Sequence, residues 1–108
     1  MLKLKTLIFE DENPRLGECY VLSAKYVQIH PKSILVHGKL INPFNKGNYK
    51  KLDHAWVEIG DQIFDPVMDH TYPKPVYENL FKVKIYKKYS QKEVFDMILK
   101  RKTWGPWS

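Results

Sequence analysis

The chain contains a single cysteine, Cys19, among 108 residues. One cysteine excludes an internal disulfide and suits a reducing compartment, in which a free thiol persists. No apolar run reaches the roughly 20 residues that a membrane-spanning helix requires. The first residues also lack the unbroken apolar stretch of a signal peptide. We therefore expect a cytoplasmic protein that has no membrane partner.

Signatures of metal, phosphate and RNA binding are also missing. The histidines His30, His37 and His70 form no close pair with zinc-like spacing, so we expect no metal and no cofactor. The formal charge of +6 is enough to attract an acidic protein. Because the lysines are scattered along the chain, their pattern favours a solvated face over a nucleic-acid site.

The composition predicts one folded domain that spans residues 1–108. This length allows one compact unit and leaves no room for a second. Hydrophobic residues make up 44% of the chain and aromatic residues 14%, which suffices for a core and argues against disorder.

Two helices are predicted from apolar residues at helical spacing. The first covers residues 19–29 and should bury Cys19, Leu22, Tyr26 and Ile29, and Pro31 should end it. The second follows a capping box from Ser90 to Glu93 and should bury its apolar stripe. That stripe consists of Val94, Phe95, Ile98 and Leu99.

Strands and loops are assigned from alternation and from turn residues. Residues 81–89 should form a half-buried strand, and the tail over residues 104–107 should pack back on the body. The tyrosines Tyr20, Tyr26, Tyr72 and Tyr77 are interpreted as packing residues with hydrated hydroxyls. The other strands are expected over residues 2–9, 33–41, 52–59 and 62–67, and loops over 11–17, 42–48 and 67–80.

A two-residue turn at Gly60-Asp61 fixes the geometry of one predicted hairpin. Glycine in the first central position suits a type II′ turn, which pairs Ile59 with Gln62 and Val57 with Phe64. Because side chains alternate across a strand, His54 and Trp56 then share one face with Asp65. As diagonal neighbours, His54 and Asp65 are close enough for a hydrogen bond.

Cys19, His54 and Asp65 together suggest nucleophilic catalysis by a thiol. A helix N-terminus and a neighbouring imidazolium both favour the reactive thiolate. His54 would then carry the proton, and Asp65 would orient the ring. The backbone N–H of Cys19 could stabilise an oxyanion, with Asn13 or Tyr20 as the second donor.

Each of these residues also has a structural interpretation. A free cysteine on an apolar helix face is often a small core residue. His54 could simply be a strand residue, and Asp65 before Pro66 is a suitable turn residue. Trp56 could line a substrate cleft or shield the His–Asp pair. The joint placement of the three polar residues favours catalysis.

Three motifs resemble the core of the transglutaminase-like branch of the papain-like cysteine hydrolase superfamily. They are Gly-Glu-Cys-Tyr over residues 17–20, His-Ala-Trp-Val-Glu over 54–58 and Phe-Asp-Pro over 64–66. The resemblance implies an α+β fold in which an N-terminal helix bearing the cysteine packs on a mostly antiparallel sheet. It also implies that Cys19 is the nucleophile, His54 the base and Asp65 the orienting acid.

The expected activity is that of a cysteine-dependent hydrolase or acyltransferase. Its substrate would be an amide in a protein or peptide: a peptide bond, an isopeptide bond or a glutamine side chain. The alternative is a non-catalytic binding module with the same fold, whose basic surface binds an acidic protein or nucleic acid. We expect a protein or peptide substrate and no nucleic acid.

Overall fold

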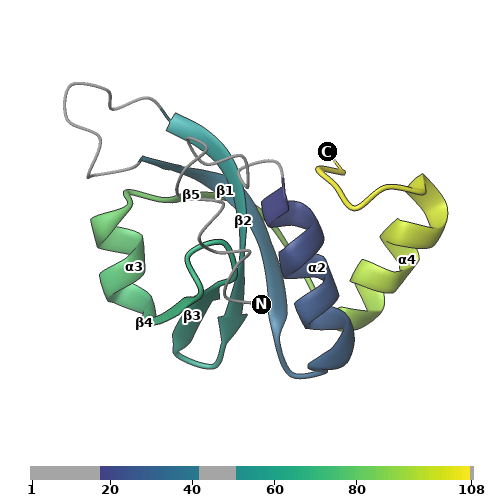
Figure 1. The fold of residues 1–108 in the computed structure, drawn as a ribbon, viewed down its shortest axis with the longest axis horizontal. Coiled ribbons are helices and arrows are strands. Elements are labelled where there is room, and N and C mark those ends of the chain that lie inside the picture. The colour runs from purple at the N-terminus through teal and green to yellow at the C-terminus, as the bar shows by residue number, and fades with distance from the viewer. Residues whose placement is uncertain (1–17, 42–50, 108) are drawn as a thin grey trace, which may run out of the picture.

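The computed structural model describes residues 18–41 and 51–107. Within them the fold is α+β: a helix bearing Cys19, an antiparallel five-stranded sheet and a C-terminal helix (Figure 1). Several predictions lie outside the described residues: Asn13, the strand over residues 2–9 and the loops over 11–17 and 42–48. The elements are α2 Cys19–Ile29, β1 Ile34–Ile41, β2 Lys51–Ile59, β3 Gln62–Asp65, β4 His70–Pro73, α3 Lys74–Leu80, β5 Lys84–Tyr89 and α4 Gln91–Arg101.

The strands follow the order β4-β3-β2-β1-β5. The hairpin between β2 and β3 has the predicted register, with Ile59 opposite Gln62 and Val57 opposite Phe64. Gly60 has a φ of 61°, whereas Asp61 is not among the residues with positive φ. This combination is that of a type II′ turn, and it confirms the prediction.

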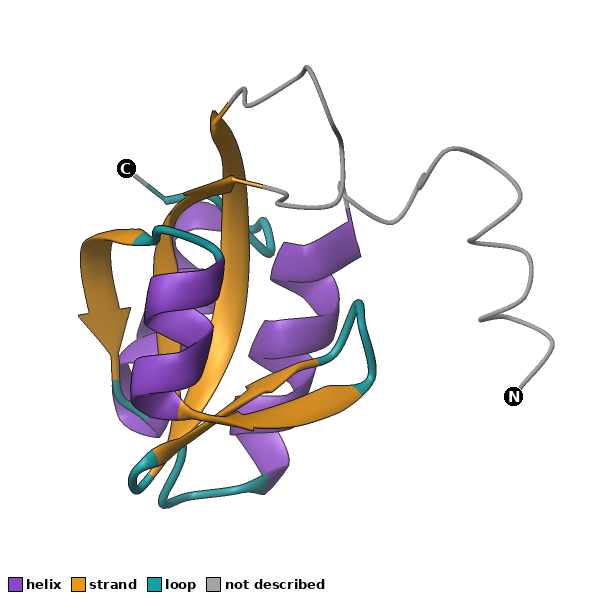
Figure 2. Cartoon of the chain, turned by 90° about the vertical axis from the view of Figure 1, so that its left-hand side faces the viewer, coloured by secondary structure: helices purple, strands orange, loops and turns teal. Residues whose placement is uncertain are grey.

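Helices cover both faces of the sheet, α2 and α4 on one side and α3 on the other (Figures 1 and 2). Two core clusters fill the layers between them. The α2 cluster consists of Cys19, Ala24, Val27, Leu35, Ala55, Val57, Tyr89, Val94 and Trp107. The α3 cluster consists of Val36, Leu40, Trp56, Ile63, Tyr77 and Phe81. Ala55 and Trp56 therefore face opposite sides of β2, as strand alternation requires.

The buried stripe of α2 differs from the prediction. Cys19, Ser23 and Val27 are buried at intervals of four residues, together with Ala24, whereas Ile29 is 74% exposed. Small side chains let this helix lie close to the sheet, and the hydroxyl of Ser23 donates to the carbonyl of Ala55 over 3.2 Å. Apolar spacing predicts Leu22 and Ile29 on the buried face, but the hydrogen-bonded Ser23 is buried instead.

The expectation of an irregular loop over residues 67–80 is wrong, because this segment forms β4 and α3. Pro73 is the N-cap residue of α3, and Pro75 lies in its first turn. Proline is tolerated at both places because the first N–H groups of a helix have no partner within the helix. The pair Pro73 and Pro75 therefore starts a helix here.

The apolar side chains of β5 and α4 are less buried than their spacing predicts. In β5 only Tyr89 is buried, and Ile85 is 37% exposed, because this strand lies at an edge of the sheet. The capping box of α4 is present as predicted. Phe95 and Leu99 on that helix are nevertheless 43% and 71% exposed, and only Val94 is buried.

The C-terminal tail packs back on the body as predicted, and it encloses His37. Trp107 is 3% exposed, and its ring centroid lies 5.2 Å from that of His37. The rings of Tyr20 and Tyr89 contact the same imidazole at 4.9 and 5.0 Å. Its Nε2 is buried and has no hydrogen-bond partner among the described residues. Burial lowers the pKa of His37 to about 4, so the ring is neutral at physiological pH.

We expect His37 to make the protein less stable in acid. The unfolded chain takes up a proton near pH 6.5 and the folded chain only near pH 4, so the free energy of unfolding falls over this window. The expected loss is on the order of 3 kcal/mol. Urea unfolding at pH 7 and pH 4.5 would measure it, and His37→Phe should reduce the loss. An equal pH dependence in both proteins would contradict this.

Gly38 should tolerate a side chain far less well than Gly60. A Cβ on Gly38 would overlap the carbonyl oxygen of Lys84 and lie 2.9 Å from Cη2 of Trp56. Gly60 has open space around it and only an unfavourable φ. We expect Gly38→Ala to lower the free energy of unfolding by about 3 kcal/mol or more and Gly60→Ala by about 1–2 kcal/mol. Chemical denaturation would measure both values, and equal costs would contradict the steric argument.

Candidate active site

Cys19 is the first residue of α2, where the backbone N–H groups have no partner within the helix and give the helix end a partial positive charge. Its side chain is a free thiol with no exposed surface. The structure therefore confirms a cysteine at a helix start. It also places the thiol inside the protein, so any reagent can reach the sulfur only after the groups that cover it move.

His54 and Asp65 lie together, as the hairpin register predicted. Nε2 of His54 is 2.8 Å from Oδ2 of Asp65, and the two side chains are 2% and 0% exposed. The other ring nitrogen, Nδ1, is buried without a well-formed hydrogen bond among the described residues. The Cys19 thiol lies close enough to the ring to affect the pKa of His54. Since Nε2 is engaged with Asp65, Nδ1 is the nitrogen available to the thiol.

The carboxylate of Asp65 accepts four hydrogen bonds. Oδ2 accepts from His54 and from the hydroxyl of Tyr77, the latter over 2.7 Å. Oδ1 accepts from the backbone N–H groups of Val67 and Met68 over 3.0 and 3.3 Å. Burial tends to raise the pKa of Asp65, but these donors, with His54 foremost, lower it overall. Asp65 is thus both a turn residue and the ionised partner of the ring.

His54 is positively charged at neutral pH. Burial acts to lower the pKa of His54, whereas the hydrogen bond and charge of Asp65 raise it, and the Cys19 thiol adds to that effect. The net result is a pKa of about 10. The site therefore holds an imidazolium between a carboxylate and a thiol, and such a neighbour favours the thiolate form of cysteine.

Trp56 shields this pair from water. Its side chain has no exposed surface, and its ring stacks on His54 with centroids 6.0 Å apart. The ring of Trp56 also packs against that of Tyr77, with centroids 5.6 Å apart. With no free surface in this arrangement, Trp56 is placed to exclude water and keep the charged pair in a weakly polar setting.

Of the two residues considered as oxyanion donors, only Tyr20 is described. It directs its ring edge-on against His37, and a Cβ on Gly105 would lie 3.2 Å from Cδ1 of Tyr20. The backbone N–H of Cys19 remains a candidate oxyanion donor because it lies at the start of α2. Asn13 lies outside the described residues and stays a prediction.

Tyr77 is the residue that sequence reasoning missed. The prediction of a hydrated hydroxyl is wrong for Tyr77. This hydroxyl is buried and donates to Asp65. Burial and the charge of Asp65 raise the pKa of Tyr77, so the hydroxyl keeps the proton that it donates. The signal that could have found this residue is the pair Pro73 and Pro75, because proline at a helix start predicts a helix that carries Tyr77.

Within residues 18–41 and 51–107, no group of three or more His, Cys, Asp or Glu side chains is arranged to hold a metal ion. Among the same residues, no helix is long and apolar enough to cross a membrane. Comparisons with protein-family models, curated proteins and solved structures found no match. The proposed function therefore depends on the geometry of the site.

We expect Tyr77→Phe to destabilise the protein through Asp65. Loss of a hydrogen bond to a buried charge should lower the free energy of unfolding by about 1.5–3 kcal/mol at pH 7. The folded-state pKa of Asp65 is depressed, so its contribution is present at neutral pH and is lost as the pH falls through that pKa. The deficit of the variant should shrink in the same range, as urea unfolding would show.

Tyr72→Phe is the matched control for this test. The hydroxyl of Tyr72 donates to the sulfur of Met68 over 3.3 Å, which is a weak bond to a neutral acceptor. Its loss should cost less than about 1 kcal/mol. Equal losses in the two variants, or a deficit in Tyr77→Phe that does not change with pH, would show that the hydroxyl of Tyr77 does not act on the carboxylate.

Proposed function

We propose that the chain is a cysteine-dependent hydrolase or acyltransferase that acts on an amide through a thioester intermediate. The observation that supports this most strongly is the hydrogen bond of 2.8 Å between His54 and Asp65, with the thiol of Cys19 beside the same ring. The three residues come from α2, β2 and β3, and their meeting in one place is what nucleophilic catalysis by a thiol requires.

In the first step Cys19, as the thiolate of a thiolate–imidazolium pair with His54, attacks the carbonyl carbon of the amide and forms a C–S bond. The developing oxyanion is stabilised by the backbone N–H of Cys19, with Asn13 or Tyr20 as the proposed second donor. The imidazolium of His54 gives its proton to the amine, and the C–N bond breaks. The amine leaves, and the acyl group stays on Cys19 as a thioester.

In the second step a water molecule attacks the thioester. Neutral His54 takes a proton from the water, the C–S bond breaks, and a carboxylic acid leaves. The imidazolium and the thiolate are then restored. Asp65 holds the ring in one orientation through both steps, and Tyr77 holds Asp65. An amine in place of the water would give acyl transfer.

The substrate we propose is an amide of a protein or peptide: a peptide bond, an isopeptide bond or a glutamine side chain. We favour hydrolysis or deamidation over crosslinking, because the sequence contains no motif for a dedicated amine site. No cofactor enters these steps, since the thiol, imidazole and carboxylate supply the nucleophile, the proton carrier and the orienting charge.

The second candidate is a binding module that keeps this fold without catalysis. The observation that favours it is the complete burial of Cys19, whose side chain belongs to the α2 cluster. A buried cysteine that never meets a substrate is a small apolar core residue. The two candidates therefore differ in whether the thiol of the folded protein reacts.

The reaction of Cys19 with iodoacetamide distinguishes them. At pH 6 an ordinary thiol is almost entirely protonated, whereas a thiol beside an imidazolium reacts as the thiolate. We expect the native protein to be alkylated at least tenfold faster at pH 6 than the urea-denatured chain. The ratio should fall towards pH 9, where ordinary thiols ionise. Mass spectrometry would follow both rates, and Cys19→Ala should take up no label while remaining folded by circular dichroism.

The role of His54 is tested by His54→Gln, with His70→Gln as the matched control, because His70 is exposed. We expect His54→Gln to lose the rate advantage at pH 6 and His70→Gln to keep it. A native thiol that reacts no faster than the denatured one at any pH, with no effect of His54→Gln, would favour the binding module.

A further inference from the structure

We propose that β5 is a docking edge at which an extended acidic segment of a partner protein pairs as an additional strand of the sheet. The proposal goes beyond the catalytic function and does not depend on Cys19. It rests on three features of β5: an unpaired backbone edge, exposed apolar side chains and a charge of one sign.

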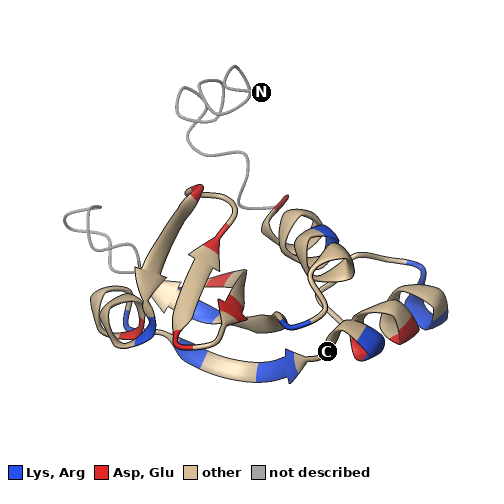
Figure 3. Ribbon diagram, turned by 90° about the horizontal axis from the view of Figure 1, so that it is seen from below, with Lys and Arg blue, Asp and Glu red and all other residues tan. Residues whose placement is uncertain are grey.

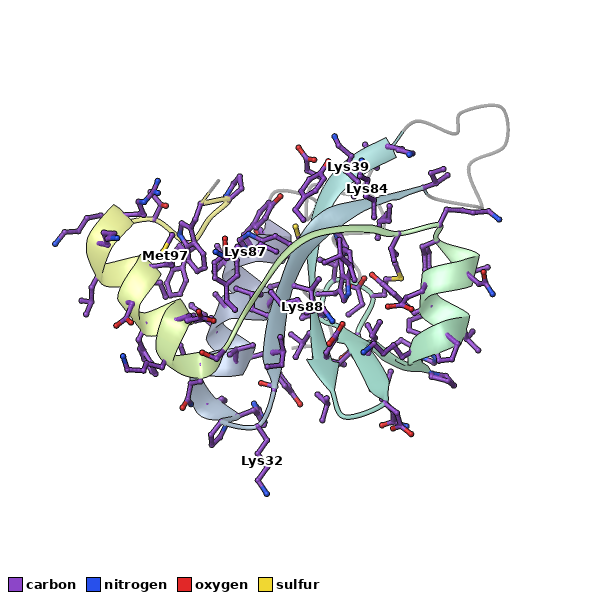
Figure 4. All side chains as sticks on the ribbon, turned by 180° about the vertical axis from the view of Figure 1, so that it is seen from behind. Lys32, Lys39, Lys84, Lys87, Lys88 and Met97 are labelled. Atoms are coloured by element: carbon purple, nitrogen blue, oxygen red, sulfur yellow. The ribbon has the colours of Figure 1, made fainter. Side chains whose placement is uncertain are left out.

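Among the residues that the structure describes, no segment pairs with the outer edge of β5. β5 stands at the end of the strand order and pairs with β1 on one side only. Within the described part of the chain, no backbone hydrogen bond outside the sheet ladder involves residues of β5. In Figure 4 the strand crosses the face turned towards the viewer, with no element in front of it. An unpaired edge of this kind is a template for a further strand.

The opposite edge of the sheet is a poorer template. β4 has only four residues, His70–Pro73, and its last residue is a proline, which cannot donate to a ladder. The chain then turns directly into α3. β5 is longer, with six residues and no proline, so it is the edge with room for a partner strand.

Apolar groups on β5 are available to anchor such a partner. Ile85 and Tyr86 are 37% and 48% exposed, although they lie within a strand. The register between β1 and β5 shifts at Gly38, so Tyr86 is the extra residue of a bulge between Ile85 and Lys87. The two exposed side chains are thus adjacent at the place where β5 bends.

The charges on β5 select an acidic partner. β5 contains three lysines and no acidic residue, and the strand that leads into α4 in Figure 3 is blue without red. Lys88 pairs with Glu58, and the neighbouring Lys39 pairs with Asp53. Lys84 and Lys87 form no ion pair with an acidic side chain among the described residues, although the charge of Lys87 is near enough to Glu93 to help lower the pKa of that carboxyl. Their ammonium groups are therefore left to attract further carboxylates.

The same lysines exclude a second copy of this chain. Like charges that face each other across two strands are destabilising, so two β5 edges repel. Edge lysines and bulges commonly protect a strand from self-association. An acidic strand turns that repulsion into attraction, and β5 is therefore selective for it.

A direct test uses a fluorescein-labelled peptide of eight residues that alternates glutamate and valine. We expect it to bind the native protein and to shift the backbone amide signals of Lys84–Tyr89 in NMR spectra. The double variant Lys84→Glu/Lys87→Glu should bind at least tenfold more weakly. The matched control Lys32→Glu/Lys100→Glu carries the same change in charge away from β5 and should bind nearly as well as the native protein.

Two further ligands separate strand pairing from simple attraction of charges. The same peptide with methyl groups on alternate backbone nitrogens keeps its charge but cannot complete a ladder, and it should bind at least tenfold more weakly. A single-stranded oligothymidylate of eight nucleotides should bind more weakly than the peptide. Cys19→Ala should leave peptide binding unchanged, so this test and the alkylation test fail independently.

Several results would overturn the proposal: no binding of the peptide, equal weakening by both double variants, full binding of the methylated peptide, or tighter binding of the oligonucleotide. A protein dimer detected by sedimentation and lost in Lys84→Glu/Lys87→Glu would assign the edge to a second copy of the chain instead.

Discussion

The buried carboxylate of Asp65 is the group on which the arrangement of the site depends. A charge without exposed surface is tolerated only if hydrogen bonds and an opposite charge replace the water that it has lost. Asp65 obtains these from three parts of the chain: the ring of His54 on β2, the backbone that follows β3 and the hydroxyl of Tyr77 on α3. The hydrogen bonds to this one carboxylate therefore connect three elements: the β2–β3 hairpin, the turn that follows β3, and α3.

The two buried histidines show how much this carboxylate matters. His37 and His54 are 5% and 2% exposed, and both are on strands of the same sheet. His37 packs against the rings of Tyr20, Tyr89 and Trp107, and burial alone lowers its pKa to about 4. His54 faces Asp65, and its pKa rises to about 10 although it is buried at least as deeply as His37. The partner, and not the depth of burial, therefore decides which histidine is charged and able to deliver a proton.

Local signals predicted the parts of the fold that depend on a few neighbouring residues. Gly60-Asp61 fixed the turn and the register, and through them the contact between His54 and Asp65. Apolar spacing did not reveal which face of α2 is buried, because Ser23 is accepted in the core by a carbonyl of another strand. Alternation in β5 likewise could not show that the strand lies at an edge. Tyr77 was missed because its partner lies twelve residues away and the prolines between them were interpreted as a loop.

Charged groups in the interior and on the surface of the molecule differ in whether the chain supplies an opposite charge. Inside, an imidazolium persists because a carboxylate of the same chain stands 2.8 Å from it. On β5, Lys88 forms an ion pair with Glu58, whereas Lys84 and Lys87 form no ion pair among the described residues. Water solvates these two ammonium groups at little cost, so the fold does not need a partner for its stability. The free backbone edge beside them is different, because only another strand offers matching donors and acceptors in register. A segment that carries both carboxylates and an extended backbone meets both requirements at once, and a folded acidic surface or a phosphate chain meets only the first.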